Sequence, residues 1–183
     1  MGHIMKKTIS DNYLSMQKDM HKNPNYGVAS LSFGSLVAEL ISKSNARSVS
    51  DYGAGKKNLY VALQANGVSF DNYYPYDPAF PEYGPPRIAD LVCCIDVLEH
   101  IEAEYLGHVL SDLAEITRNL GFFSVHMGPA SKVLPDGRNA HLIQKPISWW
   151  IPIISEHFEI IQLQKHNLMG EGFWIVVTPK NAL

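Results

Sequence analysis

Acidic residues and histidines in this chain are spaced so that they could hold a ligand and move a proton. Asp51 stands just ahead of the glycine-rich stretch Gly53-Ala54-Gly55, and Asp77 ends the apolar segment that follows. The cluster Asp96-Val97-Leu98-Glu99-His100 comes directly after the apolar run Leu91–Ile95. Carboxylates accept hydrogen bonds from hydroxyl and amino groups, and imidazoles act as general bases or metal ligands near neutral pH. These residue types therefore indicate a binding site with acid–base or metal chemistry.

These residues need a framework that brings them together, and the hydrophobic pattern predicts a doubly wound α/β domain. The run Leu91–Ile95 is expected to be a central parallel strand covered on both faces. Alternation of strands and helices, followed by two closing strands, predicts a mostly parallel sheet with a C-terminal antiparallel strand. The predicted strands are 48–51, 69–76, 91–95, 122–127, 158–163 and 173–178, and the predicted helices are 12–20, 32–42, 58–65, 105–118 and 146–157.

Bulk properties narrow the class of protein further. The 183 residues suffice for one domain, expected to span 1–183 with residues 1–46 as an N-terminal helical extension or lid. A net charge of −3 makes a dedicated nucleic-acid binder an unfavoured interpretation. The apolar runs fall short of a membrane span. The adjacent Cys93 and Cys94 suit a reducing compartment, so a cytoplasmic protein is expected. The expected partner is a small-molecule substrate.

The spacing of the glycine stretch excludes two common nucleotide-binding motifs. In a doubly wound sheet, ligands bind beyond the carboxyl ends of the strands, where glycines let the backbone approach them closely. A dinucleotide fingerprint would place a third small residue at position 58, but the chain has Asn58. A phosphate-binding P-loop would need glycine at position 50 and serine or threonine at position 57, where Ser50 and Lys57 stand.

The order acid, any residue, glycine, any residue, glycine, followed by Asp77 and the Asp96–His100 cluster, resembles the Rossmann-type S-adenosylmethionine-dependent methyltransferases. The resemblance covers residues 48–178. It implies that the glycine turn lines the methionine end of the cofactor, with Asp51 near its amino group. Asp77 would bind the ribose hydroxyls. The implied cofactor-binding residues are Asp51, Gly53, Ala54, Gly55, Asp77, Pro78, Ile95, Asp96, Val97 and, from the N-terminal segment, Tyr26.

One segment departs from the pattern of these methyltransferases. They usually carry a further helix and strand between the ribose-binding acid and the buried strand. Here only about a dozen residues separate Asp77 from Asp90, and Pro78, Pro81, Pro85 and Pro86 interrupt them. The third strand of the family is therefore expected to be shortened or missing, which leaves the residues that hold adenine unassigned.

Methyl transfer requires in-line attack by an acceptor, and it needs a general base only when the acceptor carries a proton. The candidate catalytic residues are His100, His141 and Glu99. The candidate substrate residues are Arg138, Asn139 and His126, because the polar loop 128–142 follows a strand that ends at the same crevice. Two structural alternatives stay open: His100 could cap backbone groups, and His126 could be a core histidine.

A metal-assisted version of the site is also open. Glu99, His100 and His141 resemble the ligands of metal-assisted ribose or phenol O-methyltransferases, including enzymes that methylate small-RNA termini. The leading function is therefore transfer of methyl from S-adenosylmethionine to a small-molecule or sugar-type acceptor at oxygen or nitrogen. The alternatives are a non-catalytic module that binds S-adenosylmethionine or a nucleotide, and a metal-assisted RNA ribose 2′-O-methyltransferase.

Overall fold

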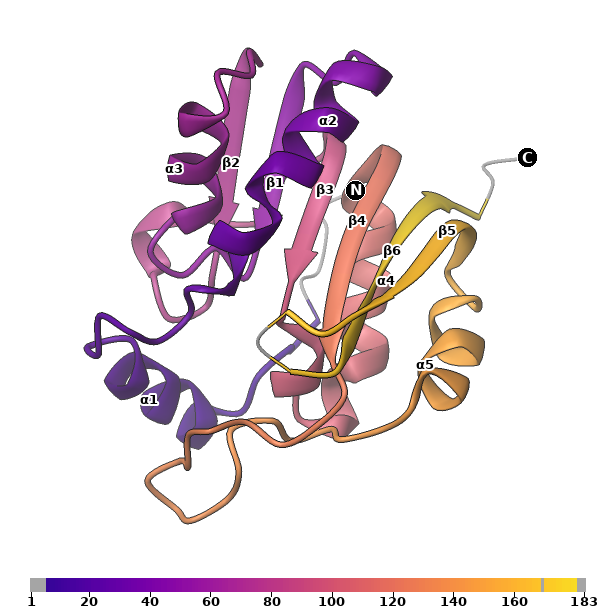
Figure 1. The fold of residues 1–183 in the computed structure, drawn as a ribbon. Helices are drawn as coiled ribbons and strands as arrows, with labels where there is room; N and C mark the ends of the chain where they lie inside the picture. The colour runs from indigo at the N-terminus through magenta and orange to yellow at the C-terminus, as the bar shows by residue number, and fades with distance from the viewer. Residues whose placement is uncertain (1–5, 169, 181–183) are drawn as a thin grey trace.

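The described residues, 6–168 and 170–180 of a computed structural model, form one six-stranded sheet flanked by helices (Figure 1). The strand order is β2-β1-β3-β4-β6-β5. The strands are β1 (Ser48–Tyr52), β2 (Asn72–Tyr76), β3 (Ala89–Ile95), β4 (Thr117–His126), β5 (Phe158–His166) and β6 (Gly172–Pro179). The α-helices are α1 (Asp11–Met20), α2 (Gly34–Ser44), α3 (Asn58–Ala65), α4 (Leu106–Ile116) and α5 (Ile147–Ile154). Four short 3₁₀ turns are η1 (Ala29–Phe33), η2 (Pro81–Tyr83), η3 (Leu98–His100) and η4 (Ala103–Tyr105).

The predicted fold class is confirmed by the pairing of the strands. β2, β1, β3 and β4 run parallel, and β6 pairs antiparallel with both β4 and β5. The parallel pairs need crossover connections, which α3 and α4 supply, whereas the closing pair is a hairpin. The carboxyl ends of the four parallel strands consequently meet at one edge of the sheet, where the chemistry-bearing residues were expected.

Two hydrophobic cores cover the two faces of the sheet. Successive side chains of a strand point to opposite faces, and β3 contributes to both cores: Val92 and Cys94 pack with α4 and α5, and Leu91 and Cys93 pack with α2 and α3. All four side chains are fully buried. This double burial explains why a continuous apolar run, with no alternation, forms the central strand.

Several element boundaries differ from the predicted ones. β2 begins at Asn72 rather than at residue 69, and β4 begins at Thr117 rather than at residue 122. The Leu98–His100 segment is a separate 3₁₀ turn, because Ile101 is extended and ends it before α4 starts. Between β2 and β3 the described chain holds only the short turn η2. The strand that these methyltransferases usually carry at this point of the chain, expected to be shortened or missing, is therefore confirmed as missing.

None of the helices in the described ranges is long and apolar enough to cross a membrane.

Candidate functional site

A cavity of about 720 Å³ opens at the carboxyl ends of the parallel strands. Its wall combines the turn after β1, the end of β2, the segment after β3, the end of β4 and the N-terminal segment around α1. The structure brings together all ten residues that the resemblance assigned to the cofactor: Asp51, Gly53, Ala54, Gly55, Asp77, Pro78, Ile95, Asp96, Val97 and Tyr26. A volume of this size suits a nucleoside-sized ligand together with a small acceptor.

The turn after β1 is shaped by glycines in the left-handed region. Gly53 has φ +81°, and a Cβ added there would lie 2.4 Å from Val97 Cγ2. The amides of Gly53 and Ala54 both donate to the carbonyl of Tyr76, at 2.7 and 2.9 Å. The turn is therefore tied to the end of β2 and pressed against the wall formed by Val97, and only glycine fits at position 53.

Asp77 joins the end of β2 to this turn. Its Oδ2 accepts a hydrogen bond from the Gly55 amide at 2.9 Å, and its Oδ1 accepts one from the Ala79 amide at 2.8 Å. The side chain is buried, and burial raises the pKa of its carboxyl group above the usual value. Each carboxylate oxygen can accept a second hydrogen bond, so Asp77 keeps acceptor capacity for a ligand in the cavity that it lines.

Asp51 is the second buried carboxyl group at this end of the cavity. It is only 3% exposed, and the Tyr73 hydroxyl donates a hydrogen bond to its Oδ2. Burial raises the pKa of Asp51 to about 7, although the bond from Tyr73 favours the charged form. The group is consequently poised between its two protonation states at neutral pH.

Asp96 lies directly after β3 in a strained backbone conformation, with φ +51°. Its Oδ1 accepts a hydrogen bond from the Ser124 hydroxyl at 2.6 Å, and its amide donates to the Ser124 carbonyl at 3.1 Å. Left-handed conformations at residues other than glycine persist where surrounding contacts enforce them, and they concentrate at functional sites. Here the contacts with β4 fix the half-buried carboxylate against the cavity.

His100 and His141 form an adjoining part of the wall, with ring centroids 4.7 Å apart. Nδ1 of His100 lies 2.8 Å from the Ala140 carbonyl, and Nδ1 of His141 lies 2.7 Å from the Gly128 carbonyl. Because a carbonyl only accepts, both Nδ1 atoms carry the hydrogen and both Nε2 atoms keep a lone pair. Burial lowers the pKa of His141 and lowers that of His100 to about 3. Both rings are thus neutral, and the free lone pair of each lies on Nε2.

Glu99 lies behind these histidines and is fully buried. Its Oε1 accepts a hydrogen bond from the His126 amide at 2.8 Å, whereas its Oε2 has no hydrogen-bond partner in the described structure. Burial raises the pKa of Glu99 well above its usual value, and the nearby charge of Asp96 adds to the effect. One ligand atom each from Glu99, His100 and His141 lie within 4.8 Å of one another.

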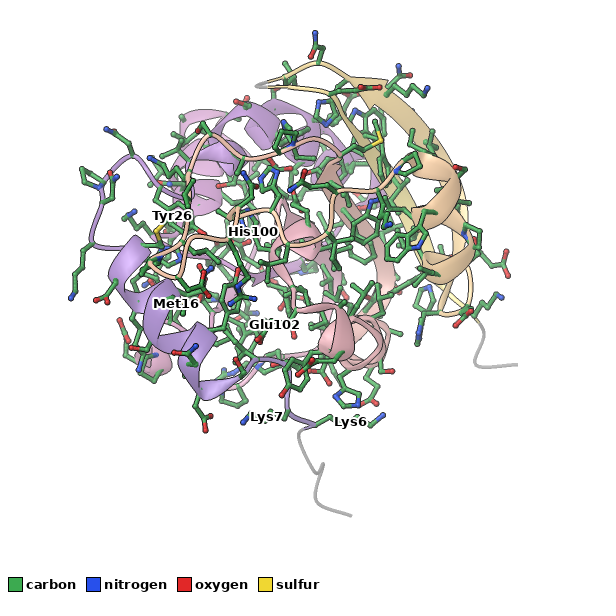
Figure 2. The ribbon with its side chains drawn as sticks, turned by 90° about the horizontal axis from the view of Figure 1, so that it is seen from below. Lys6, Lys7, Met16, Tyr26, His100 and Glu102 are labelled. Atoms are coloured by element: carbon green, nitrogen blue, oxygen red, sulfur yellow. The ribbon has the colours of Figure 1, made fainter. Side chains whose placement is uncertain are left out.

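The segment around α1 is held against this site by polar contacts. Figure 2 shows α1, with Met16, beside Tyr26, His100 and Glu102. The Ser10 amide and hydroxyl donate to the two carboxylate oxygens of Glu102, at 2.8 and 2.7 Å. The Tyr13 hydroxyl donates to the His100 carbonyl at 2.8 Å. α1 therefore contributes to the wall of the cavity at a defined position.

His21 is a site residue that the sequence did not reveal. Its ring lies against the glycine turn, since a Cβ added to Gly55 would be 3.1 Å from His21 Cε1. It also makes edge contacts with Tyr26 and Phe80, both with ring centroids 5.0 Å apart. No sequence signal marks His21, because only the packing of the N-terminal segment onto the turn brings it into the cavity.

The three predicted substrate residues fall in different places. His126 ends β4 and lines the cavity. Arg138 is exposed and forms an ion pair with Asp136 at 2.7 Å, and the Asn139 amide group bonds to the backbone of Ala130 at 2.9 Å in both directions. Neither Arg138 nor Asn139 is part of the described cavity wall. Their side chains instead stabilise the loop that carries His141.

Comparisons with known proteins identify the fold. No family model matches the chain, and no curated protein matches it. Among solved structures, the Burkholderia thailandensis 1,6-didemethyltoxoflavin-N1-methyltransferase with bound 1,6-didemethyltoxoflavin and S-adenosylhomocysteine is 12% identical, with a TM-score of 0.66, over 96% of this chain and 93% of that one. These matches extend over nearly the whole of both proteins.

Two further structures agree with the first. The N-methyltransferase NodS from Bradyrhizobium japonicum, in complex with S-adenosylhomocysteine, is 9% identical over 93% of this chain and 100% of that chain, with a TM-score of 0.57. The magnesium protoporphyrin IX methyltransferase from Synechocystis, with bound S-adenosylmethionine, is 16% identical over 97% and 88% of the two chains, with a TM-score of 0.58. The chain thus has the fold of the Rossmann-type S-adenosylmethionine-dependent methyltransferases.

Proposed function

We propose that the protein transfers a methyl group from S-adenosylmethionine to a small-molecule or sugar-type acceptor, at oxygen or nitrogen. The observation that carries this proposal is that the glycine turn, two buried carboxyl groups and two neutral histidines meet in one cavity. The protein shares its fold, over most of each chain, with structures that hold S-adenosylmethionine or S-adenosylhomocysteine. This likeness supports the same reaction class.

The residues present fit this cofactor. A Cβ at Gly53 would clash with Val97, so glycine at this position lets the turn and Val97 pack together as one wall of the cavity. Asp51 would accept from the amino group of the cofactor, and Asp77 would accept from the ribose hydroxyls. When bound, S-adenosylmethionine supplies an electrophilic methyl group. The neutral Nε2 of His100 or His141 would accept the acceptor's proton, and the enclosing walls would exclude water.

The ribose role of Asp77 predicts a large loss of affinity in the Asp77→Asn variant. The asparagine amide could accept from only one of the Gly55 and Ala79 amides and would present N–H to the other. It would also weaken the bonds to ribose. We expect S-adenosylhomocysteine to bind about tenfold more weakly or worse, as measured by calorimetry. The matched control is Asp71→Asn, on an exposed carboxylate paired with Arg47, which should bind normally. Wild-type affinity in Asp77→Asn would contradict the assignment.

A metal-assisted reaction is a second candidate, favoured by the unpartnered Oε2 of buried Glu99 and by the two lone pairs beside it. Imidazole and carboxylate ligands suit Mg²⁺, Mn²⁺ or Zn²⁺. The bonds from both Nδ1 atoms to backbone carbonyls are the outer contacts that orient metal-binding histidines. Glu99, His100 and His141 would hold the ion, which would lower the pKa of an acceptor hydroxyl.

Metal binding can be measured without turnover. If the three residues hold an ion, the wild-type protein should bind Mn²⁺ in a calorimetric titration, and His141→Ala should weaken that binding about ten- to a hundredfold. The control is His157→Ala, because His157 precedes β5 at the opposite end of the sheet. Equal Mn²⁺ affinity in all three proteins would remove the metal from the site and leave the histidines as bases.

Two other functions would each give an experimental result that differs from that of the proposed function. A binding module without catalysis would take up S-adenosylhomocysteine but transfer no methyl group to any acceptor in a metabolite extract. An RNA methyltransferase would bind RNA with a strong dependence on salt concentration. The acidic balance of the chain favours the small-molecule acceptor.

The N-terminal segment and the cysteines support two further parts of the proposal. We propose residues 1–46 as an N-terminal helical extension whose part around α1 forms a lid over the cavity, and the bonds from Ser10 and Tyr13 onto the site support this role. Residues 1–5 of this segment lie outside the described structure. The free, buried thiols of Cys93 and Cys94 suit a reducing cytoplasm.

A further inference from the structure

Tyr73 lies on β2, and its side chain contacts Asp51 on the neighbouring strand β1. Its hydroxyl donates a hydrogen bond to Asp51 Oδ2. The ring is set by packing on its own side of the sheet, with centroids 5.0 Å from Tyr60 and 6.2 Å from Phe70. The ring is half-buried, and its packing against these two aromatic side chains restricts the direction of the hydroxyl. The bond is therefore a built feature of the strand and not a chance contact of a mobile side chain.

Asp51 has little else in the protein to favour its charged form. In the described chain no ion pair involves it. The other titratable groups that interact electrostatically with it are Asp77 after β2, Tyr83 in η2, and Cys93 and Cys94 on β3. None of these groups is a cation, and the negative charge of Asp77 raises the pKa of Asp51. The hydroxyl of Tyr73 is the contact that acts in the opposite direction.

We propose that Tyr73 is a positioning residue that keeps Asp51 as an oriented carboxylate, ready to receive the positively charged amino group of the cofactor. This inference rests on the proposed function, because it presumes that the amino-acid half of the cofactor lies against Asp51. One oxygen of Asp51 is held by Tyr73, and the carboxyl group lines the cavity. A carboxylate oriented in advance loses less free energy when it binds a ligand than a mobile one does.

The proposal makes affinity depend on pH in a defined direction. The pKa of Asp51 in the free protein is about 7. Below that pH the group is mostly neutral and attracts an ammonium group weakly, so binding of an amino-acid-bearing ligand should strengthen as pH rises through this value. Removing the hydroxyl donor raises the pKa of Asp51 further, because a hydrogen bond to the charged form is lost. The profile of Tyr73→Phe should consequently move to higher pH.

The experiment compares two nucleosides by calorimetry from about pH 5.5 to about pH 9. S-adenosylhomocysteine carries the amino acid, and 5′-methylthioadenosine lacks it. The proteins are wild type, Tyr73→Phe and the control Tyr74→Phe, whose ring packs under Arg87 at 5.3 Å. Phenylalanine preserves the packing of Tyr73 against its aromatic neighbours, and circular dichroism checks that each variant is folded.

We expect the S-adenosylhomocysteine profile of Tyr73→Phe to move upward by about one pH unit, which makes binding about fivefold weaker at pH 7. The two profiles should converge at high pH. Affinity for 5′-methylthioadenosine and every profile of Tyr74→Phe should match the wild type. A Tyr73→Phe profile that overlays the wild-type one, with S-adenosylhomocysteine still bound, overturns the role of Tyr73 and leaves the proposed function intact.

The wild-type protein alone gives a second measurement that does not depend on the folding of any variant. The difference between the two ligands should grow with pH through about 7. A difference that is constant with pH overturns the role of Asp51 as a titrating carboxylate, and with it the role of Tyr73. Failure of S-adenosylhomocysteine to bind at any pH overturns the proposed function itself.

Discussion

The Gly53→Ala variant is expected to lose S-adenosylhomocysteine affinity about a hundredfold or more. Its Cβ would lie 2.4 Å from Val97 Cγ2, and an L-residue at φ +81° is strained even without that contact. Strain and overpacking each cost about 1–3 kcal/mol, and a hundredfold in affinity corresponds to about 2.7 kcal/mol. Relief requires movement of either the turn or Val97, and both form the cavity wall. Calorimetry measures the loss of affinity, and thermal unfolding measures the loss of stability.

Gly67→Ala is the matched control for Gly53→Ala. Gly67 also has a positive φ, +66°, but a Cβ added there meets nothing within 4 Å. It therefore isolates the backbone cost, about 1 kcal/mol of stability, from the steric contact. The Gly67→Ala variant should unfold at a slightly lower temperature than the wild type and should bind S-adenosylhomocysteine with wild-type affinity. Equal affinities of the two variants would show that the contact with Val97 does not shape the binding site.

Asp51→Asn is expected to stabilise the free protein at pH 8 by a few kcal/mol. The pKa of Asp51 is raised by burial from 3.8 to about 7. At about 1.36 kcal/mol for each pH unit, keeping this carboxylate charged costs about 4 kcal/mol above pH 7. The folded state holds the proton more tightly than the unfolded state does, so stability falls as pH rises through this range. Asparagine removes that cost and can still accept from the Tyr73 hydroxyl.

The expected gain for Asp51→Asn depends on pH. It should be largest above about pH 7 and should shrink to almost nothing at about pH 3, below the ordinary carboxyl pKa of 3.8, where Asp51 is mostly protonated in both states. Urea unfolding at the two pH values measures it. The same variant should bind S-adenosylhomocysteine more weakly at pH 8, because the ammonium group loses its carboxylate. A gain that is equal at both pH values, or a loss at pH 8, would contradict the account.

Much of the fold could be predicted from the sequence because hydrophobic periodicity reports burial directly. The apolar run at Leu91–Ile95 becomes β3 since both of its faces are covered. Nine of the ten predicted cofactor residues line one cavity because they lie at the ends of parallel strands, or just after them, at the same edge of the sheet, and Tyr26 joins them from the N-terminal segment. Their contacts with a cofactor stay a prediction that the proposed binding measurements test.

Side chains placed by tertiary packing could not be predicted in the same way. His21 reaches the glycine turn only because α1 is anchored by Ser10 and Tyr13 to the segment after β3. In the loop 128–142, position alone did not separate His141, which faces the cavity, from Arg138, which pairs with Asp136 outside it. The geometry of a loop depends on its own internal hydrogen bonds, which leave no periodic signal.

The sheet ends at β2, with only the turn η2 between it and β3 in the described chain. Outer strands carry unpaired backbone groups that can join another molecule's strand and start aggregation. Pro75 lies within β2 and has no amide hydrogen to offer, so an added strand could not form a regular ladder there. The edge of the sheet at β2, beyond which the described chain has no further strand, therefore resists self-association. The Pro75→Thr variant should form β-rich aggregates more readily than the wild type in concentrated solution.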